Sequence, residues 1–308
     1  MNTSVLDAIK KSAAVPSMPQ VVARFLEIMQ DPNFEYADLV KVLSVDPGTV
    51  SEILRLANSA LFGVRNKIIS LRQGLTLLGP KRVRSLVLGR YLVDSVSKQS
   101  VAGLDMSYFW RRSLSASVIA SRFAERELPQ LKEEVFLAAL LADIGIPILG
   151  EAFPTQYQDF IDEYCPHGRS FTPAQEHGTV GATHGEVAGI VLAHWGLPDV
   201  ICKAVVMHHA ERPGSGDYAS IARLLNAADR IAKLLCEVSD TDVIIDVCSE
   251  AMDVAKIDLS FLTGMLPTIE RDIEELAEVL KIDVVPSHVY TLIAEAIQTT
   301  LCGQGEDD

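Results

Sequence analysis

The stretch Glu133–Ile148, EEVFLAALLADIGIPI, decides the fold of this chain. Its apolar residues recur at helical spacing and predict a helix with one apolar face, formed by Val135, Phe136, Ala139 and Leu140. Asp143 follows the last two by four and three residues, which places it on the same face. Gly145 is predicted to end the helix. Because a buried aspartate needs a partner, we expect this carboxylate to point inward at another polar group.

The composition limits the classes of partner. The chain has 308 residues and is 48% hydrophobic, enough for one large or two medium domains with a sizeable core. Its net charge of -14 argues against nucleic acid and against an anionic membrane surface as partners. One basic cluster exists, which we interpret as the solvated face of a helix and not as a binding patch. Its members are Lys81, Arg82, Arg84 and Arg90.

The sequence also predicts a cytoplasmic protein. We expect no apolar run to reach the ~20 residues of a membrane span, and residues 1–15 lack the apolar core of a signal peptide. The cysteines are odd in number and contain no CxxC pair, which favours neither a disulfide framework nor a zinc knuckle. They are Cys165, Cys202, Cys236, Cys248 and Cys302.

Nearly every other segment also has the apolar spacing of a helix, so the predicted fold class is all-α. The polar stretch 97–105 is interpreted as the seam between two helical halves. The predicted helices are 21–30, 36–43, 47–58, 70–78, 81–95, 109–125, 133–143, 153–164, 179–195, 198–209, 220–235 and 257–280.

Further polar residues lie on apolar helix faces, as Asp143 does. Arg112, His184 and Asp229 each interrupt such a face, and His208 and His209 are adjacent at a helix end. One reading is a set of separate core side chains, each bonded to a backbone carbonyl. The other is a shared polar pocket, whose imidazoles and carboxylates are natural ligands of a divalent first-row metal. Such an ion could hold a hydroxide for attack on a phosphoester.

A family resemblance rests on several motifs. The run LRLANSALFG at residues 54–63 resembles the signature of the HDOD family, the output-domain branch of the HD phosphohydrolase superfamily. Collinear pieces resemble the same family between about Val15 and Leu235. They are Val15–Pro19, Ile69–Leu71, Leu77–Gly79, Phe109-Trp110 and Trp195–Pro198. Within the first motif, Asn58, Ser59 and Phe62 are interpreted as helix termination and packing.

The resemblance implies an N-terminal helical bundle packed on an HD-like helical bundle, with a helical C-terminal tail. We expect an N-terminal helical subdomain at 1–98, an HD-like helical subdomain at 105–236 and a C-terminal helical extension at 237–308. The last residues, 303–308, are expected to be a frayed acidic tail.

The resemblance also implies which residues match the metal site of HD enzymes. The first histidine ligand matches Arg112, the histidine of the HD doublet matches Ala142, and the lysine that often follows matches Ile146. The remaining ligand positions keep a metal-binding residue type. They are Asp143, His184, His208, His209 and Asp229.

The substitution at Arg112 predicts a vestigial pocket of Arg112, Asp143 and Asp229. A guanidinium is permanently charged and carries five donors, so it could lie between two carboxylates in place of an ion. It cannot activate water, and we therefore expect no cofactor. The alternative is one divalent metal ion held by the five residues that keep a ligand type.

Three functions remain open at this point. The first is a non-catalytic bacterial signal-transduction module that acts through protein partners. The second is a metal-dependent phosphohydrolase of a nucleotide or cyclic dinucleotide. The third is a module that binds a phosphorylated ligand, with Arg112 as the anion clamp.

Overall fold

The computed structural model describes residues 18–31, 33–58, 64–98, 101–237 and 240–282. Single described residues outside these ranges are Val5, Ile9, Val15, Ile293 and Glu295. Every regular element in the described part is a helix, which confirms the all-α prediction. The predictions for Ser59, Phe62, Cys302 and the tail 303–308 lie outside the described residues.

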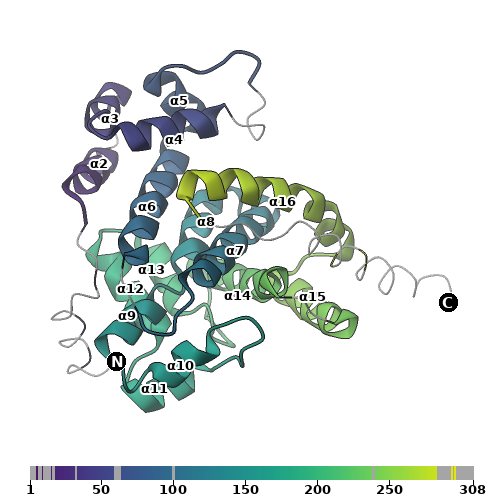
Figure 1. Cartoon of the computed structure of the whole chain (residues 1–308). Helices are drawn as coiled ribbons and strands as arrows, with labels where there is room; N and C mark the ends of the chain where they lie inside the picture. The colour runs from purple at the N-terminus through teal and green to yellow at the C-terminus, as the bar shows by residue number, and fades with distance from the viewer. Residues whose placement is uncertain are drawn as a thin grey trace.

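The first helices form one end of the molecule (Figure 1). They are α2 (Gln20–Gln30), α3 (Tyr36–Leu43), α4 (Pro47–Ala57) and α5 (Leu71–Leu78), and α6 (Pro80–Ser97) runs from this end into the centre of the molecule. Asp46 caps α4 by accepting from the backbone N–H of Gly48 and Thr49. At the other end, the Asn58 amide donates to the carbonyls of Leu54 at 2.7 Å and Ile68 at 2.8 Å. Asn58 therefore terminates α4, as its residue type predicted.

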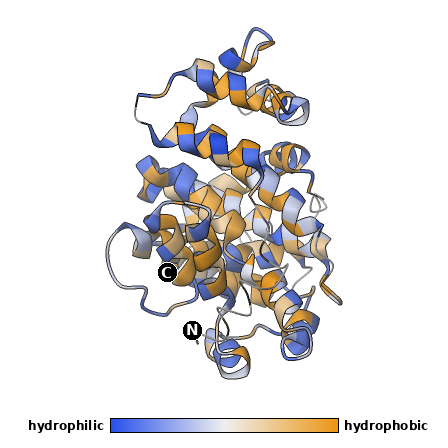
Figure 2. Ribbon diagram, turned by 90° about the vertical axis from the view of Figure 1, so that its left-hand side faces the viewer, coloured by the Kyte–Doolittle hydropathy of each residue, from blue (hydrophilic) through white to orange (hydrophobic). Residues whose placement is uncertain are grey.

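The central helices surround α8, the helix of the opening stretch. They are α7 (Met106–Glu127), the 3-10 turn η1 (Pro129–Leu131), α8 (Lys132–Leu141), α9 (Gly145–Ala152), α10 (Gln158–Glu163), α11 (Pro173–Val180), α12 (His184–His194), α13 (Asp199–Val206) and α14 (Asp217–Cys236). Every residue of α8 from Glu134 to Leu141 is buried. A helix that is apolar on all sides belongs in a core, and α6, α7, α13 and α14 pack around it. Figure 2 shows this centre as predominantly hydrophobic.

The prediction that Gly145 ends a helix is wrong. α8 ends at Leu141, and Gly145 is the first residue of α9. A Cβ at Gly145 would lie 2.0 Å from the backbone oxygen of His184. Glycine is therefore required by the close approach of α9 to α12, and not by a helix C-terminus.

The single helix predicted at 179–195 is also wrong, because the chain breaks at residues 181–183. Gly181 has a left-handed conformation with φ 79°, which ends α11. Thr183 then caps α12 and forms a capping box with Glu186. This break makes His184 the first residue of its helix.

The last described helices are α15 (Thr241–Ala255) and α16 (Leu259–Leu280). α15 packs on α14, whereas α16 packs on α7, α6 and α4. Two ion pairs tie its end to α4: Glu278 lies 3.5 Å from Arg55, and Lys281 lies 3.8 Å from Glu52. The extension predicted at 237–308 thus contacts both predicted subdomains, and the boundaries between the three segments stay a prediction.

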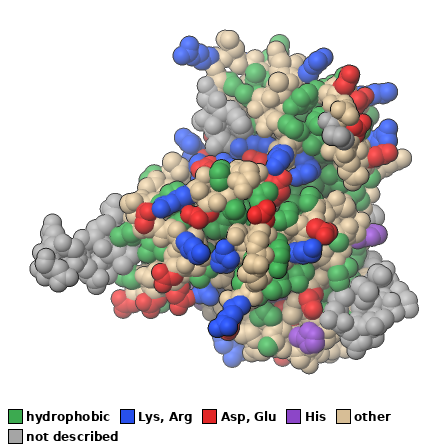
Figure 3. All heavy atoms as spheres, turned by 180° about the vertical axis from the view of Figure 1, so that it is seen from behind, with side chains coloured by type: hydrophobic (Ala, Val, Ile, Leu, Met, Phe, Trp, Pro, Cys, Tyr) green, Lys and Arg blue, Asp and Glu red, His purple; other side chains and the backbone are tan. Residues whose placement is uncertain are grey.

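The basic cluster of α6 consists of ion-paired side chains. Glu134 lies 3.2 Å from both Lys81 and Arg84, and Glu52 accepts from Arg90 at 3.0 Å. The face in Figure 3 carries Lys and Arg interspersed with Asp and Glu among the described residues. These contacts support the reading of the cluster as a helix face and give no indication of a binding patch.

One segment contradicts the expectation that no run is long enough to cross a membrane. Residues Pro129–Ala152 are long and apolar enough by composition. In the structure, 89% of that window is buried inside the protein. This burial is consistent with the core of a soluble protein; the cytoplasmic location stays a prediction.

Candidate functional site

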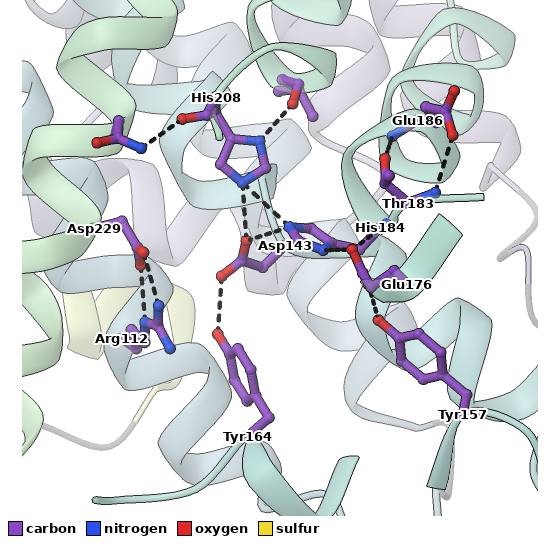
Figure 4. A network of polar contacts seen from close by, with 12 residues as sticks. Arg112, Asp143, Tyr157, Tyr164, Glu176, Thr183, His184, Glu186, His208 and Asp229 are labelled. Carbon is purple, nitrogen blue, oxygen red and sulfur yellow. Dashed lines mark hydrogen bonds and ion pairs between the residues drawn. The ribbon is translucent and has the colours of Figure 1, made fainter. Parts of the chain in front are cut away.

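A cavity of about 430 Å³ opens where the central helices converge. Its wall includes α7, the turn after α8, the end of α10 with the loop that follows it, the first residue of α12, the second half of α14, and α15. The predicted residues that line it are Arg112, Asp143, His184, His209 and Asp229. His208 is buried behind them and contacts Asp143 (Figure 4).

Arg112 and Asp229 form one half of the site, and we call them the ion pair. The Arg112 Nε donates to Asp229 Oδ1 at 2.8 Å, and its Nη2 donates to Oδ2 at 2.7 Å. The side chains are only 14% and 17% exposed. Burial opposes the charge of Arg112, but Asp229 outweighs it and raises the Arg112 pKa well above its usual value. Both carboxylate oxygens of Asp229 are thereby engaged by one guanidinium.

Asp143, His184, His208 and His209 form the other half, which we call the histidine cluster. Asp143 is buried as predicted, although it lies in the turn beyond α8. Its Oδ1 lies 3.6 Å from His184 Nε2 and 3.4 Å from His208 Nε2. The two Nε2 atoms are 3.3 Å apart. One ligand-type atom from each of the four residues falls within 4.8 Å of the others.

The outer nitrogen of each buried histidine has a fixed acceptor. His184 Nδ1 lies 2.7 Å from Glu176 Oε2, and His208 Nδ1 lies 2.5 Å from the Val205 carbonyl oxygen. Because these oxygens only accept, each Nδ1 carries the proton. In a neutral ring the inner Nε2 then has a lone pair facing the Asp143 carboxylate, whereas in a charged ring it carries a proton that it can donate to Asp143. A proton or a metal ion at this point would relieve their repulsion.

The pKa shifts of Asp143 and His184, but not that of His209, agree with a site that attracts positive charge. Burial acts against ionisation of Asp143, but the hydrogen bond to His208 and the charges of His184 and Arg112 hold its pKa well below the usual range. Burial also disfavours charged His184, yet the Glu176 carboxylate raises the His184 pKa overall. His209 lacks such a carboxylate partner, and burial together with the neighbouring histidines holds its pKa well below normal.

Tyr164 joins the two halves. Its hydroxyl donates to Asp143 Oδ2 at 2.9 Å, while the Arg112 guanidinium carbon lies 5.0 Å from its ring centroid. This distance is typical of a cation–π contact. Arg112 therefore hydrogen-bonds Asp229 and acts on Asp143 through its charge and through Tyr164. The role of Arg112, Asp143 and Asp229 as a vestigial pocket stays a prediction.

The histidine cluster is a chemically suitable set of metal ligands. Imidazole and carboxylate suit first-row divalent ions, and the hydrogen bonds on Nδ1 orient both buried rings with Nε2 inward. Asp229 is directed at Arg112 instead, so the structure separates it from the other four candidate ligands. An ion held tetrahedrally by all four cluster residues would have no position left for water.

Three contributing residues were missed from the sequence: Tyr157, Tyr164 and Glu176. Glu176 is fully buried, accepts from His184 N at 3.2 Å and is hydrogen-bonded by the Tyr157 hydroxyl. The capping box of Thr172 and Gln175 is a signal that could have placed a helix around Glu176. No sequence pattern indicates that this glutamate faces His184, eight residues away.

Comparison with known proteins matches residues 15–211 to the HDOD domain. An uncharacterized protein of Treponema pallidum (strain Nichols) is 20% identical over 201 residues, which cover 63% of this chain but only 38% of that protein.

Two solved structures share the fold over 90% of this chain at 21% identity. One is a protein provisionally named a phosphohydrolase from Shewanella amazonensis SB2B, with a TM-score of 0.72 and 98% of its chain covered. The other is an HDOD domain protein of unknown function from Geobacter sulfurreducens, with a TM-score of 0.68 and 97% covered.

Proposed function

Because this chain belongs to the HDOD domain family, we propose that it is a non-catalytic regulatory module that transmits a signal through contacts with protein partners. We place it in the bacterial cytoplasm. The observation that carries this proposal is the ion pair of Arg112 and Asp229. According to the family resemblance, Arg112 and Asp229 stand at two positions where the related HD enzymes bind their metal ion, and here the two side chains bind each other.

Two further positions support a non-catalytic role. Ala142 and Ile146 stand where the resemblance has the histidine of the HD doublet and the lysine after it. Both are buried, and neither has a group that can bind a metal or move a proton. The same argument weakens the anion-clamp hypothesis, because two donor groups of Arg112 are already bound to Asp229.

A metal-dependent phosphohydrolase remains the second candidate, and the histidine cluster is what favours it. Four ligand-type residues lie close enough to hold one ion. A bound divalent metal would supply a hydroxide at neutral pH, provided that it kept an open coordination position. The chain's own residues would orient the ligands through Glu176 and the Val205 carbonyl.

Metal analysis with a turnover assay separates the two candidates. The purified protein is analysed for metal and then incubated with Mn²⁺ and a panel of nucleotides and cyclic dinucleotides. We expect no hydrolysis above that of a His184→Ala/His208→Ala control. Stoichiometric metal together with turnover that this control abolishes would overturn the non-catalytic proposal.

The partner-mediated part has its own experiment. The full chain is used as bait in its native cell, with Arg112→Met as a pocket variant and circular dichroism as a check of folding. We expect a protein that is enriched on the wild-type bait and reduced on the folded variant if the pocket governs docking. Failure to enrich any protein over an unrelated acidic bait would contradict the proposal.

A further inference from the structure

A groove between α2 and α3 lies at the N-terminal end of the molecule, where Figure 1 shows the two helices next to each other. Its volume is about 960 Å³. Every lining residue falls between Gln20 and Val45, on α2, on α3, in the link between them or in the turn after α3. The lining shares no residue with the pocket of the ion pair and the histidine cluster, so the groove is a separate feature of the surface.

Much of the groove lining is apolar. Four of its large apolar side chains are partly buried and pack on the core, and the fifth, Val45, is 69% exposed. Exposed apolar surface interspersed with charged residues is typical of a site that contacts another protein. The four partly buried side chains are Val21, Ile28, Phe34 and Val42.

The spacing of the lining residues fits a helical occupant. Val21, Arg24 and Ile28 share one face of α2, and Asp38 and Val42 share one face of α3. Two helix faces beside an apolar groove are a known arrangement for holding the apolar side of a third helix. α2 has 11 residues and is therefore about 16 Å long, the length of about three helical turns.

The charged residues of the groove favour a basic occupant. Arg24 is paired with Glu27. Asp31 and Asp38 are exposed and have no basic partner in the described part of the chain, whereas Lys41 is the one basic lining residue there without an acidic partner. Acidic groups are thus in excess, as they are in the whole chain with its net charge of -14. Such exposed charges select the sign of a partner and speed its association more than they add affinity.

We propose that the α2–α3 groove is the docking site for an amphipathic helix of a protein partner, which has basic side chains beside its apolar face. The apolar face contacts Val21, Ile28 and Val42, and the basic side chains pair with Asp31 and Asp38. This inference rests on the proposed function, because it names the surface through which the regulatory module binds its partner. A second copy of this chain is a poorer occupant, since two molecules of charge -14 repel each other and have the same acidic excess in the groove.

A synthetic peptide is the probe for a binding experiment with the full chain. It has three turns, about 12 residues, with leucine at i, i+3, i+4 and i+7 and lysine at the flanking positions. A side-chain cross-link holds it helical, because so short a helix is unstable by itself. In a titration by fluorescence anisotropy, we expect it to bind about tenfold more tightly than a peptide with glutamate in place of each lysine, because the groove is acidic.

Two matched pairs of variants locate the bound peptide. Val45→Arg should weaken binding about tenfold, because a positive charge replaces an apolar contact. Ile69→Arg should leave it unchanged, since Ile69 is 76% exposed but lies outside the lining. Asp38→Lys should weaken binding about fivefold, because an attraction becomes a repulsion. Its control is Asp242→Lys, which makes the same charge change in the first turn of α15 and should have no effect.

All four positions are exposed, so the variants are expected to fold, which circular dichroism checks. Equal binding of the lysine and glutamate peptides would overturn the proposal. Peptide binding that Val45→Arg and Asp38→Lys leave unchanged would do the same, because the peptide would then be bound outside the groove. A dimer in sedimentation that Val45→Arg dissociates would assign the groove to a second copy of the chain.

The first pair of variants also separates this inference from the proposed function. The full chain, Val45→Arg and Ile69→Arg are each used as bait in the native cell. We expect a protein that is enriched on the wild type and on Ile69→Arg but not on Val45→Arg. Equal enrichment on all three would overturn the groove and leave the proposed function in place. Enrichment on none would contradict the proposed function, and the peptide titration would then decide on the groove.

Discussion

In the ion pair, Arg112 and Asp229 satisfy each other through two hydrogen bonds, whereas in the histidine cluster three polar groups converge without a positive charge of fixed position. Both halves are buried in the same pocket and are joined by Tyr164. The difference shows two ways of balancing buried polar groups in one pocket. The ion pair contains its own permanent cation, and the histidine cluster favours a proton or an ion.

Gly145→Ala should have the largest effect, because it disturbs the contact on which the histidine cluster is built. Its Cβ would lie 2.0 Å from the His184 backbone oxygen. We expect the free energy of unfolding in urea to fall by about 4 kcal/mol. Gly178→Ala is the control, since a Cβ there meets nothing within 4 Å. It should be neutral or slightly stabilising in α11, and equal effects of the two changes would contradict the close approach of α9 and α12.

Asp229→Ala tests whether the ion pair is self-sufficient. The change leaves the charge of Arg112 buried without its partner and should lower the free energy of unfolding by about 3 kcal/mol. The double variant Arg112→Met/Asp229→Leu should lose much less, because it removes both charges and keeps apolar volume. A double variant as unstable as Asp229→Ala would show that the pair is not an isolated unit.

Metal binding should distinguish the halves directly. In a Zn²⁺ titration by calorimetry, Glu176→Gln should weaken binding about tenfold, because it removes the carboxylate that orients His184. Asp229→Asn should change the affinity little, since Asp229 is directed at Arg112. Glu186→Gln is the control, because it removes a carboxylate charge from α12, the helix that carries His184. If Asp229→Asn and Glu176→Gln lowered the Zn²⁺ affinity equally, the ion pair and the histidine cluster would form a single metal site.

The smallest effect is expected at Asp46, a carboxylate whose hydrogen bonds come from neither an arginine nor a histidine. Burial acts to raise the pKa of Asp46, but hydrogen bonds from Tyr91, Thr49 and Gly48 outweigh it and lower the pKa below its usual 3.8. The stability that Asp46 adds is therefore complete above the unfolded pKa and is lost as the pH falls through the folded pKa. Asp46→Asn should flatten this part of the stability curve, measured by urea unfolding between pH 5 and about pH 2. If Asp46→Asn lost stability with falling pH as steeply as the wild type, other groups would be responsible for the loss of stability in acid.

The local signals were informative where a helix is terminated by its own residues. The predicted helix 36–43 agrees with α3, and the Asp46-Pro47 start and the Asn58 end agree with α4. Asp143 and His184 were predicted to face inward from the apolar spacing around them, and both are buried. These features depend on residues within one turn of each other, and such interactions are present in the sequence itself.

The helix breaks were less predictable where distant residues decide them. Gly145 was assigned to a helix end because glycine usually serves there, but its reason is the backbone of His184, which approaches from another helix. The segment 179–195 was continuous by periodicity, yet Gly181 and Thr183 divide it. Periodicity does not distinguish one long helix from two short helices with the same buried face.

The amino-acid sequence by itself determined the all-α class, the apolar core helix and the inward position of Asp143 and His184. Only the tertiary structure decided which polar residues meet: Arg112 with Asp229, His184 with Glu176, and Asp143 with two histidines and Tyr164. The physical reason is that burial is a property of one residue in its own helix. The partner of a buried charge depends on the distance and direction between helices that are far apart in the chain.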